Sequence, residues 1–309
     1  MKRLAILLVL SASLLIFNCS EKTEGAKVTA GKKPLKVVAS FLPIQVFAAN
    51  VIGTRENVIL DSLIPPQGIE PHEFSMTPKD VAKLHEADVV IINGFGFEGW
   101  LMETINEVGA ESILITASNG VTPIYYSGEN PGENKGGHKG DINPHCWASP
   151  KAAMKMVQNI TKGLSIADPA GALEYAKNAE AYLAQLEALD AQITAAVAGA
   201  PNRGIVTFHD AFDYFARDYG VKIIAAIETH PGQEPSAGEL AGLVKLIRET
   251  NIKVIFAEPQ YPKEVAEVIA KETNAEVLIL DPYETGTFSL DGYELAWQAN
   301  LKNLVKALS

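Results

Sequence analysis

Short apolar segments alternate with amphipathic segments along most of this chain, and the order repeats once. Continuously apolar, β-branched runs are typical of strands buried on both faces of a parallel sheet. The chain therefore predicts an α/β protein with two lobes, each built on a parallel sheet. The strand-like runs cover residues 37–41, 58–64, 89–93 and 113–116, and then 204–208, 221–226, 253–257 and 277–280. Helical patterns cover residues 78–86, 99–108, 211–219, 237–249, 263–273 and 292–307.

A single long helix is predicted between the two sets of strands. Residues 168–199 begin with Asp168 and Pro169, which favour a helix start, and residues 172–198 contain no glycine or proline. About 28 helical residues span roughly 40 Å, close to the length of a two-lobed protein. We predict lobes at residues 35–167 and 200–309 joined by this rigid helix. The alternative is an ordinary surface helix of one large domain.

The first 19 residues have the pattern of a secretion signal. Lys2 and Arg3 precede an apolar stretch at residues 4–17, which is short for a membrane span, and Cys19 follows. This order is typical of a bacterial lipoprotein in which Cys19 is the lipid attachment site. The alternative is an uncleaved membrane anchor. Both interpretations put the protein outside the cytoplasm and tethered to a membrane, in the periplasm or on the outer face of the cell membrane.

Two polar segments are predicted to be flexible. Residues 20–34 have no periodicity and would form a tether, and the Gly- and Asn-rich residues 127–141 would form a mobile loop. The net charge is −11, and it becomes −13 without residues 1–18. This charge argues against nucleic acid as a partner. If Cys19 is lipidated, Cys146 is alone and no intramolecular disulfide forms.

Three of the six histidines and one aspartate lie beside predicted element ends. His209 directly follows the strand at 204–208 and Asp281 follows the strand at 277–280, where open parallel sheets bind ligands. His72 and His145 lie in two similar segments, PHEFSMTPK and PHCWASPK, in which prolines stiffen the backbone before a helix start. Three imidazoles and one carboxylate suit zinc. If these side chains converge, the protein binds a metal ion.

Other potential ligands have simpler interpretations. His85 is expected to be solvated on a helix, and His138 lies in the predicted loop. The role of His230 is ambiguous from the sequence. Cys146 is a soft donor beside His145, but adjacent side chains usually point apart, so we expect a buried structural residue. Asp210 is expected to cap a helix, with hydrogen bonding behind His209 as the alternative.

Several strings in one order resemble the metal-binding solute-binding proteins of bacterial ABC importers, the zinc and manganese group. They are LIPPQGIEPHEFSMTPKD, INGFGFEGWL, NPHCWASP, FHDAFDYFARDYG, QEPSAGELAGLVKLI, VIFAEPQ and LILDPY. The resemblance covers the chain from Val37 to its C-terminus. It implies two α/β lobes joined by a long rigid helix, with the metal in the cleft between them. It also implies that His72, His145, His209 and Asp281 are the ligands.

The resemblance also bears on the cargo. Manganese members of the group typically have a glutamate where this chain has His209, and three imidazoles favour Zn²⁺ over Mn²⁺. Two features depart from the group: the insert at 127–141 has only one histidine, and the usual Asp-Pro-His is Asn143-Pro144-His145 followed by Cys146.

The leading hypothesis is a monomeric, lipid-anchored Zn²⁺ receptor, not an enzyme, that delivers the ion to a membrane permease. Four protein ligands would leave no position for a catalytic water. A manganese or iron receptor of the same group is one alternative. A secreted zinc hydrolase with three histidine ligands is another, with Glu228 or Asp210 as its base, although no HExxH string is present. A third is an adhesin in which the metal is only structural.

Overall fold

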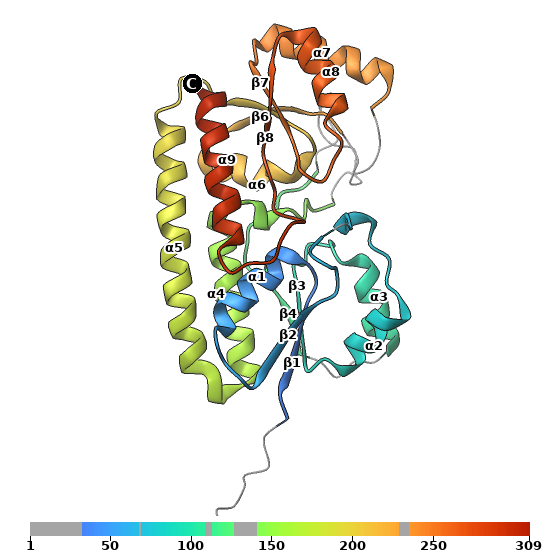
Figure 1. The fold of residues 1–309 in the computed structure, drawn as a ribbon, viewed down its shortest axis with the longest axis vertical. Helices are drawn as coiled ribbons and strands as arrows, with labels where there is room; N and C mark the ends of the chain where they lie inside the picture. The colour runs from blue at the N-terminus through green and yellow to red at the C-terminus, as the bar shows by residue number, and fades with distance from the viewer. Residues whose placement is uncertain (1–32, 68, 109–112, 127–140, 229–234) are drawn as a thin grey trace, which may run out of the picture. The chain divides into compact units, whose positions relative to one another are not determined.

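Two four-stranded parallel sheets organise the chain in this computed structural model, which describes residues 33–67, 69–108, 113–126, 141–228 and 235–309. The strand orders are β2-β1-β3-β4 and β6-β5-β7-β8, and every pair is parallel. The predicted α/β fold with two sheets is confirmed (Figure 1). The strands are β1 (Leu35–Ala39), β2 (Val58–Ser62), β3 (Val89–Ile92), β4 (Ile113–Thr116), β5 (Gly204–Thr207), β6 (Lys222–Ala226), β7 (Val254–Ala257) and β8 (Glu276–Ile279).

Helices connect and cover these strands. The helical pattern did not predict α1, because α1 buries nine of its eleven residues and so lacks a polar face. Only the start of α4, at Ser149 and Pro150, was indicated by the sequence. The helices are α1 (Leu42–Ile52), α2 (Pro78–Glu86), α3 (Gly99–Val108), α4 (Pro150–Ala167), α5 (Ala172–Ala198), α6 (Asp213–Tyr219), α7 (Ala237–Thr250), α8 (Glu264–Thr273) and α9 (Gly292–Leu308).

Both faces of the first sheet are covered, which explains its continuously apolar strands. Val38 and Val90 pack with Leu84 of α2 and Leu101 of α3. The alternate strand positions, such as Val37, belong to a second cluster with α1 and α4. Because successive side chains of a strand point to opposite faces, the central strand β3 is buried at all four positions and shows no polar alternation.

The predicted long helix is present as α5, which has 27 residues. It contacts α1, α4 and α9 (Figure 1). Its buried side chains belong to one cluster that includes Val37 of the first sheet and Phe256 of the second. Asp168 makes no capping bond, because its carboxylate accepts hydrogen bonds from Arg55 (2.8 Å) and Tyr175 (3.0 Å). A core that is continuous along α5 ties the two sheets together.

A capping box begins α2, five residues after His72. The Thr77 hydroxyl accepts from the Asp80 backbone N–H, and the Asp80 carboxylate accepts from the Thr77 N–H. Within the described residues, no helix is both long and apolar enough to cross a membrane. The predicted signal at 1–19 and almost all of the tether (20–34) and the insert (127–141) lie outside the described residues.

Candidate metal centre

Four side chains from separate segments converge on one point. They are His72, His145, His209 and Glu284, and one potential ligand atom of each lies within 4.8 Å of the others. His72 lies in the 3-10 turn Pro71–Glu73, and His145 immediately precedes another such turn. His209 follows β5, and Glu284 follows β8 by a short loop. The structure thus brings the three predicted histidines together, and Glu284 completes the group.

The carboxylate in this group is Glu284, whereas the sequence pointed to Asp281. The Asp281 Oδ1 accepts from the Tyr283 backbone N–H at 2.7 Å, and its backbone N–H donates to Asn300 Oδ1 at 2.8 Å. Tyr283 has a φ of 61°, which is unusual for a residue other than glycine. This turn redirects the chain and brings Glu284 to the histidines. Asp281 lies outside the four-residue group, and its carboxylate holds this turn.

The ligand atoms of the group are spaced about as far apart as ligands around a cation, and several of them make no hydrogen bond. The Nε2 atoms of His72 and His145 are 3.0 Å apart, and Glu284 Oε1 is 3.7 Å from His145 Nε2 and 3.5 Å from His209 Nε2. Tetrahedral zinc with bonds of about 2.05 Å places its ligand atoms about 3.3 Å apart. His209 Nε2 and both Glu284 oxygens are buried and have no hydrogen-bond partner among the described residues. These donors fit a borderline divalent metal.

A buried amide orients His145. The Asn143 Oδ1 accepts from the His145 Nδ1–H and backbone N–H, both at 2.9 Å. Its Nδ2 donates to Asp210 O (2.9 Å) and to an Asp213 oxygen (2.8 Å), so the amide cannot turn over without losing both bonds. Because Nδ1 carries the proton, Nε2 presents its lone pair to the other ligands.

A buried carboxylate orients His209 in the same way. The His209 Nδ1 lies 2.8 Å and 2.7 Å from the two oxygens of Glu258, and the His209 backbone N–H donates to Glu258 at 3.1 Å. The Gln260 side chain donates to the second oxygen at 2.9 Å. Glu258 directly follows β7, and the sequence patterns predicted no role for it. The rule that found His209 at a strand end also applies to Glu258.

Burial and charge divide the three imidazoles into two kinds. Burial lowers the pKa of His145 well below its usual value and also lowers the pKa of His72, so both are neutral at pH 7. Burial acts on His209 in the same direction, but Glu258 and Glu284 outweigh it and raise the pKa of His209 well above 6.5. Likewise His209 overcomes the effect of burial and lowers the pKa of Glu284. A metal ion would replace the proton of His209.

Aromatic rings enclose the group. Ring centroids lie 5.0 Å apart for His72 and Phe97, 5.1 Å for His145 and Trp147, and 5.6 Å for His209 and Tyr261. Apolar rings packed against the imidazoles lower the local dielectric constant, which strengthens electrostatic interactions.

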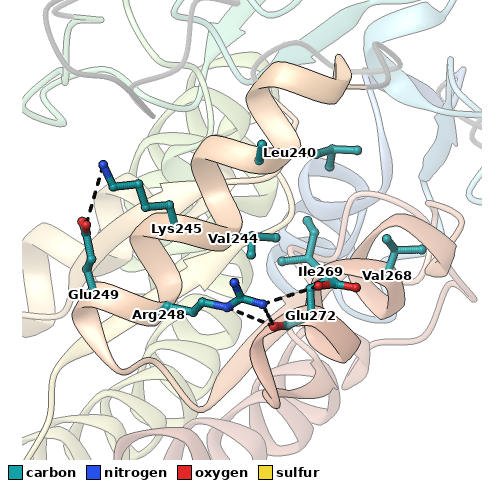
Figure 2. Close-up of a pocket in the computed structure, with 9 residues that line it drawn as sticks. Leu240, Val244, Lys245, Arg248, Glu249, Val268, Ile269 and Glu272 are labelled. Carbon is teal, nitrogen blue, oxygen red and sulfur yellow. Dashed lines mark hydrogen bonds and ion pairs between the residues drawn. The ribbon is translucent and has the colours of Figure 1, made fainter.

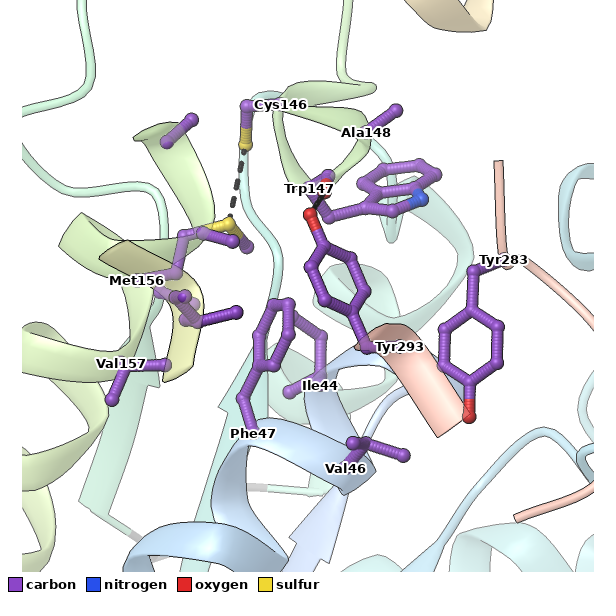
Figure 3. Packing of buried hydrophobic residues seen from close by; sticks show 14 of the residues in the cluster. Ile44, Val46, Phe47, Cys146, Trp147, Ala148, Met156, Val157, Tyr283 and Tyr293 are labelled. Atoms are coloured by element: carbon purple, nitrogen blue, oxygen red, sulfur yellow. Dashed lines mark hydrogen bonds between the residues drawn. The ribbon is translucent and has the colours of Figure 1, made fainter. Parts of the chain in front are cut away.

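Trp147 also joins the segments that carry two of the ligands. The Trp147 indole N–H donates to Pro282 O at 3.1 Å, and the Tyr293 hydroxyl donates to Trp147 O at 2.7 Å. Figure 3 shows Trp147, Tyr283 and Tyr293 in the cluster of buried hydrophobic residues. Trp147 is two residues after His145 and Pro282 is two residues before Glu284, so this bond couples the two ligand segments.

The other candidate residues lie outside the group. Cys146 is buried, with its Sγ 3.4 Å from Asn93 Oδ1 and directed towards Met156 (Figure 3), as expected for a structural residue. Asp210 is the first residue of the 3-10 turn Asp210–Phe212 and does not occupy a cap position, so the prediction of a helix cap is wrong. Glu228 is buried after β6, and His85 is exposed as expected. Cys19, His138 and His230 lie outside the described residues.

A groove of about 510 Å³ lies elsewhere, between α7 and α8. Apolar side chains such as Val244 and Val268 line it, and charged pairs such as Arg248 and Glu272 rim it (Figure 2). It shares no residue with the four-residue group.

Known proteins match almost the whole chain. The family model of the periplasmic zinc-uptake complex component A, ZnuA, matches residues 37–307. The high-affinity zinc uptake system protein ZnuA of Bacillus subtilis is 33% identical over 284 residues, which cover 90% of this chain and 88% of that protein. The zinc-binding lipoprotein AdcA of Streptococcus pneumoniae serotype 4 is 30% identical over 312 residues, but the match covers 98% of this chain and only 60% of AdcA.

A solved structure is similar over the same range. The crystal structure of the Zn(II)-bound ZnuA-like domain of S. pneumoniae AdcA has a TM-score of 0.75 and 29% sequence identity. The match covers 89% of this chain and 99% of that one.

Proposed function

The chain belongs to the ZnuA family of zinc-uptake components, and from that premise we propose that it captures Zn²⁺ outside the cytoplasm and delivers it to the permease of an ABC importer. The ion is the cargo of this protein, not a resident cofactor. His72, His145, His209 and Glu284 are the proposed ligands. Glu284 replaces Asp281 in this set because only Glu284 is grouped with the histidines.

One observation carries the proposal: three imidazoles and one carboxylate converge, and all but the half-buried His72 are buried. Among the described residues, His209 Nε2 and the Glu284 oxygens have no hydrogen-bond partner. Four protein ligands complete the tetrahedron of zinc and leave no position for a reactive water. This favours a carrier over a hydrolase, in which one position stays open.

The donor set also favours zinc over manganese. Imidazole nitrogen suits zinc, whereas manganese prefers oxygen ligands, and this site has three nitrogens to one carboxylate. The similar ZnuA-like domain of S. pneumoniae AdcA has Zn(II) bound, which agrees with this choice. A manganese or iron cargo remains the alternative within the same family.

The setting of the protein is part of the same proposal. We propose a monomer held at the membrane by a lipid on Cys19, as the lipoprotein name of AdcA suggests by analogy. It would act in the periplasm or on the outer face of the cell membrane.

Metal analysis of the purified protein tests this function. We expect about one zinc per chain, as for a single four-ligand site, which is lost on chelation and regained with the fold intact. Competitive titration with Zn²⁺ and Mn²⁺ should favour zinc, and His209→Ala should weaken zinc binding. Manganese or iron in the purified protein would contradict the choice of cargo. Unfolding on metal removal would instead support a structural metal.

A further inference from the structure

His145 and His209 donate their second ring N–H groups to acceptors of different charge. The acceptor of His145 is the neutral amide of Asn143, at 2.9 Å. The acceptor of His209 is the carboxylate of Glu258, at 2.8 Å and 2.7 Å. A carboxylate acceptor makes an imidazole a stronger metal ligand, because it increases the electron density on the ring. The two histidines therefore differ as ligands although their residue type is the same.

Neither acceptor can change its role without losing other bonds. Both Asn143 and Glu258 are buried, at 0% and 1% exposure, so water does not weaken these hydrogen bonds. The Asn143 amide nitrogen donates to Asp213 at 2.8 Å, which turns its oxygen to His145. The second oxygen of Glu258 accepts from Gln260 at 2.9 Å. The difference between the two histidines is thus fixed by the fold.

This difference follows the division between the two sheets. His145 and Asn143 precede α5, whereas His209 and Glu258 lie at the ends of β5 and β7 in the second sheet, and Glu284 follows β8. We propose that Glu258 and Asn143 are positioning residues that make the C-terminal half of the site bind the ion more strongly, so that His145 releases it before His209. This inference rests on the proposed function, because it concerns delivery of the same ion.

Two charge-neutral exchanges test the proposal. The double variant E258Q/Q260E moves the carboxylate from position 258 to position 260. The acceptor for the His209 Nδ1–H is then a neutral amide, and a hydrogen bond between positions 258 and 260 is still available. We expect its zinc affinity to fall by about 10- to 100-fold, with faster release to a chelator. The matched variant N143D/D213N puts a carboxylate on His145, and we expect slower release. Near-UV circular dichroism of the metal-free proteins checks that both fold.

A ligand-deleted background separates orientation of His209 from a general structural role. If Glu258 acts through His209, E258Q/Q260E should cause no further loss of zinc affinity when added to His209→Ala. An equal loss in both backgrounds would overturn the proposal. His209→Ala should also lose more affinity than His145→Ala, and equal or reversed losses would overturn the order of release. Wild-type protein that fails to bind zinc would overturn the proposed function as well, whereas zinc binding that E258Q/Q260E leaves unchanged would overturn this inference alone.

Discussion

Replacing Glu284 by glutamine should weaken zinc binding far more than replacing Asp281 by asparagine. Glu284 is the only carboxylate of the four-residue group, and its side chain is fully buried within 3.7 Å of two histidine nitrogens. Removing one charged partner from a buried pair costs about 3–5 kcal/mol. Each 1.4 kcal/mol is about tenfold in affinity, so this corresponds to a loss of roughly 100- to 4,000-fold. Glutamine keeps a carbonyl oxygen that can still bind metal, so we expect the lower end, about 100-fold.

The matched control is Asp281→Asn, three residues away. Asparagine keeps the oxygen that accepts from the Tyr283 N–H, so the turn is preserved and zinc affinity should change by less than about 0.5 kcal/mol. Competition for Zn²⁺ against a chromophoric chelator at pH 7 measures both variants. If Asp281→Asn loses as much affinity as Glu284→Gln, or more, the assignment of the fourth ligand is refuted.

Three further predictions follow from neighbouring contacts. Zinc binding at pH 7 should release about one proton from His209. Burial lowers the pKa of His209, but the two adjacent carboxylates outweigh this effect and raise that pKa well above 6.5. Zinc affinity should therefore rise with pH until the raised pKa of His209 is passed. Titration calorimetry in buffers of different ionisation heat measures this, and zero protons would contradict it. Trp147→Phe should destabilise the fold by about 1–3 kcal/mol in urea unfolding, because Pro282 O loses its buried donor; an unchanged midpoint would contradict this. In Gly292→Ala, the new Cβ would overlap the Tyr283 hydroxyl oxygen, so thermal unfolding should occur at lower temperature and zinc should bind more weakly. An unchanged zinc affinity would contradict a role of the neighbouring turn in the site.

Most of the fold could be predicted because the buried strands are continuously apolar. The runs at residues 89–93 and 253–257 correspond closely to β3 and β7. Helix α1 was missed because a helix that is apolar on nearly every side shows no period of 3.6 residues. The helix predicted at residues 78–86 begins where expected, whereas Asp168 was not a cap, because its carboxylate is committed to Arg55 and Tyr175. Such tertiary competition is not visible in a local pattern.

The sequence could likewise predict some residues of the candidate site but not others. Three histidines could be predicted because two sit in proline-stiffened loops and one at a strand end. The choice between Asp281 and Glu284 depended on the φ of 61° at Tyr283, a conformation that tyrosine rarely adopts and that the sequence does not signal. Glu258 was overlooked although it follows its strand as directly as His209 does.

The burial of Cys146 has a consequence for redox chemistry. Thiolates, not thiols, are oxidised and exchange with disulfides, and burial raises the pKa of Cys146 far above neutral pH. Compartments outside the cytoplasm are oxidising, so an accessible thiol there would form mixed disulfides or sulfenic acid. In the folded protein this thiol is shielded, and it becomes reactive only when the chain unfolds. Its oxidation would therefore mark molecules that have lost their structure, and native molecules would need no reductant to stay intact.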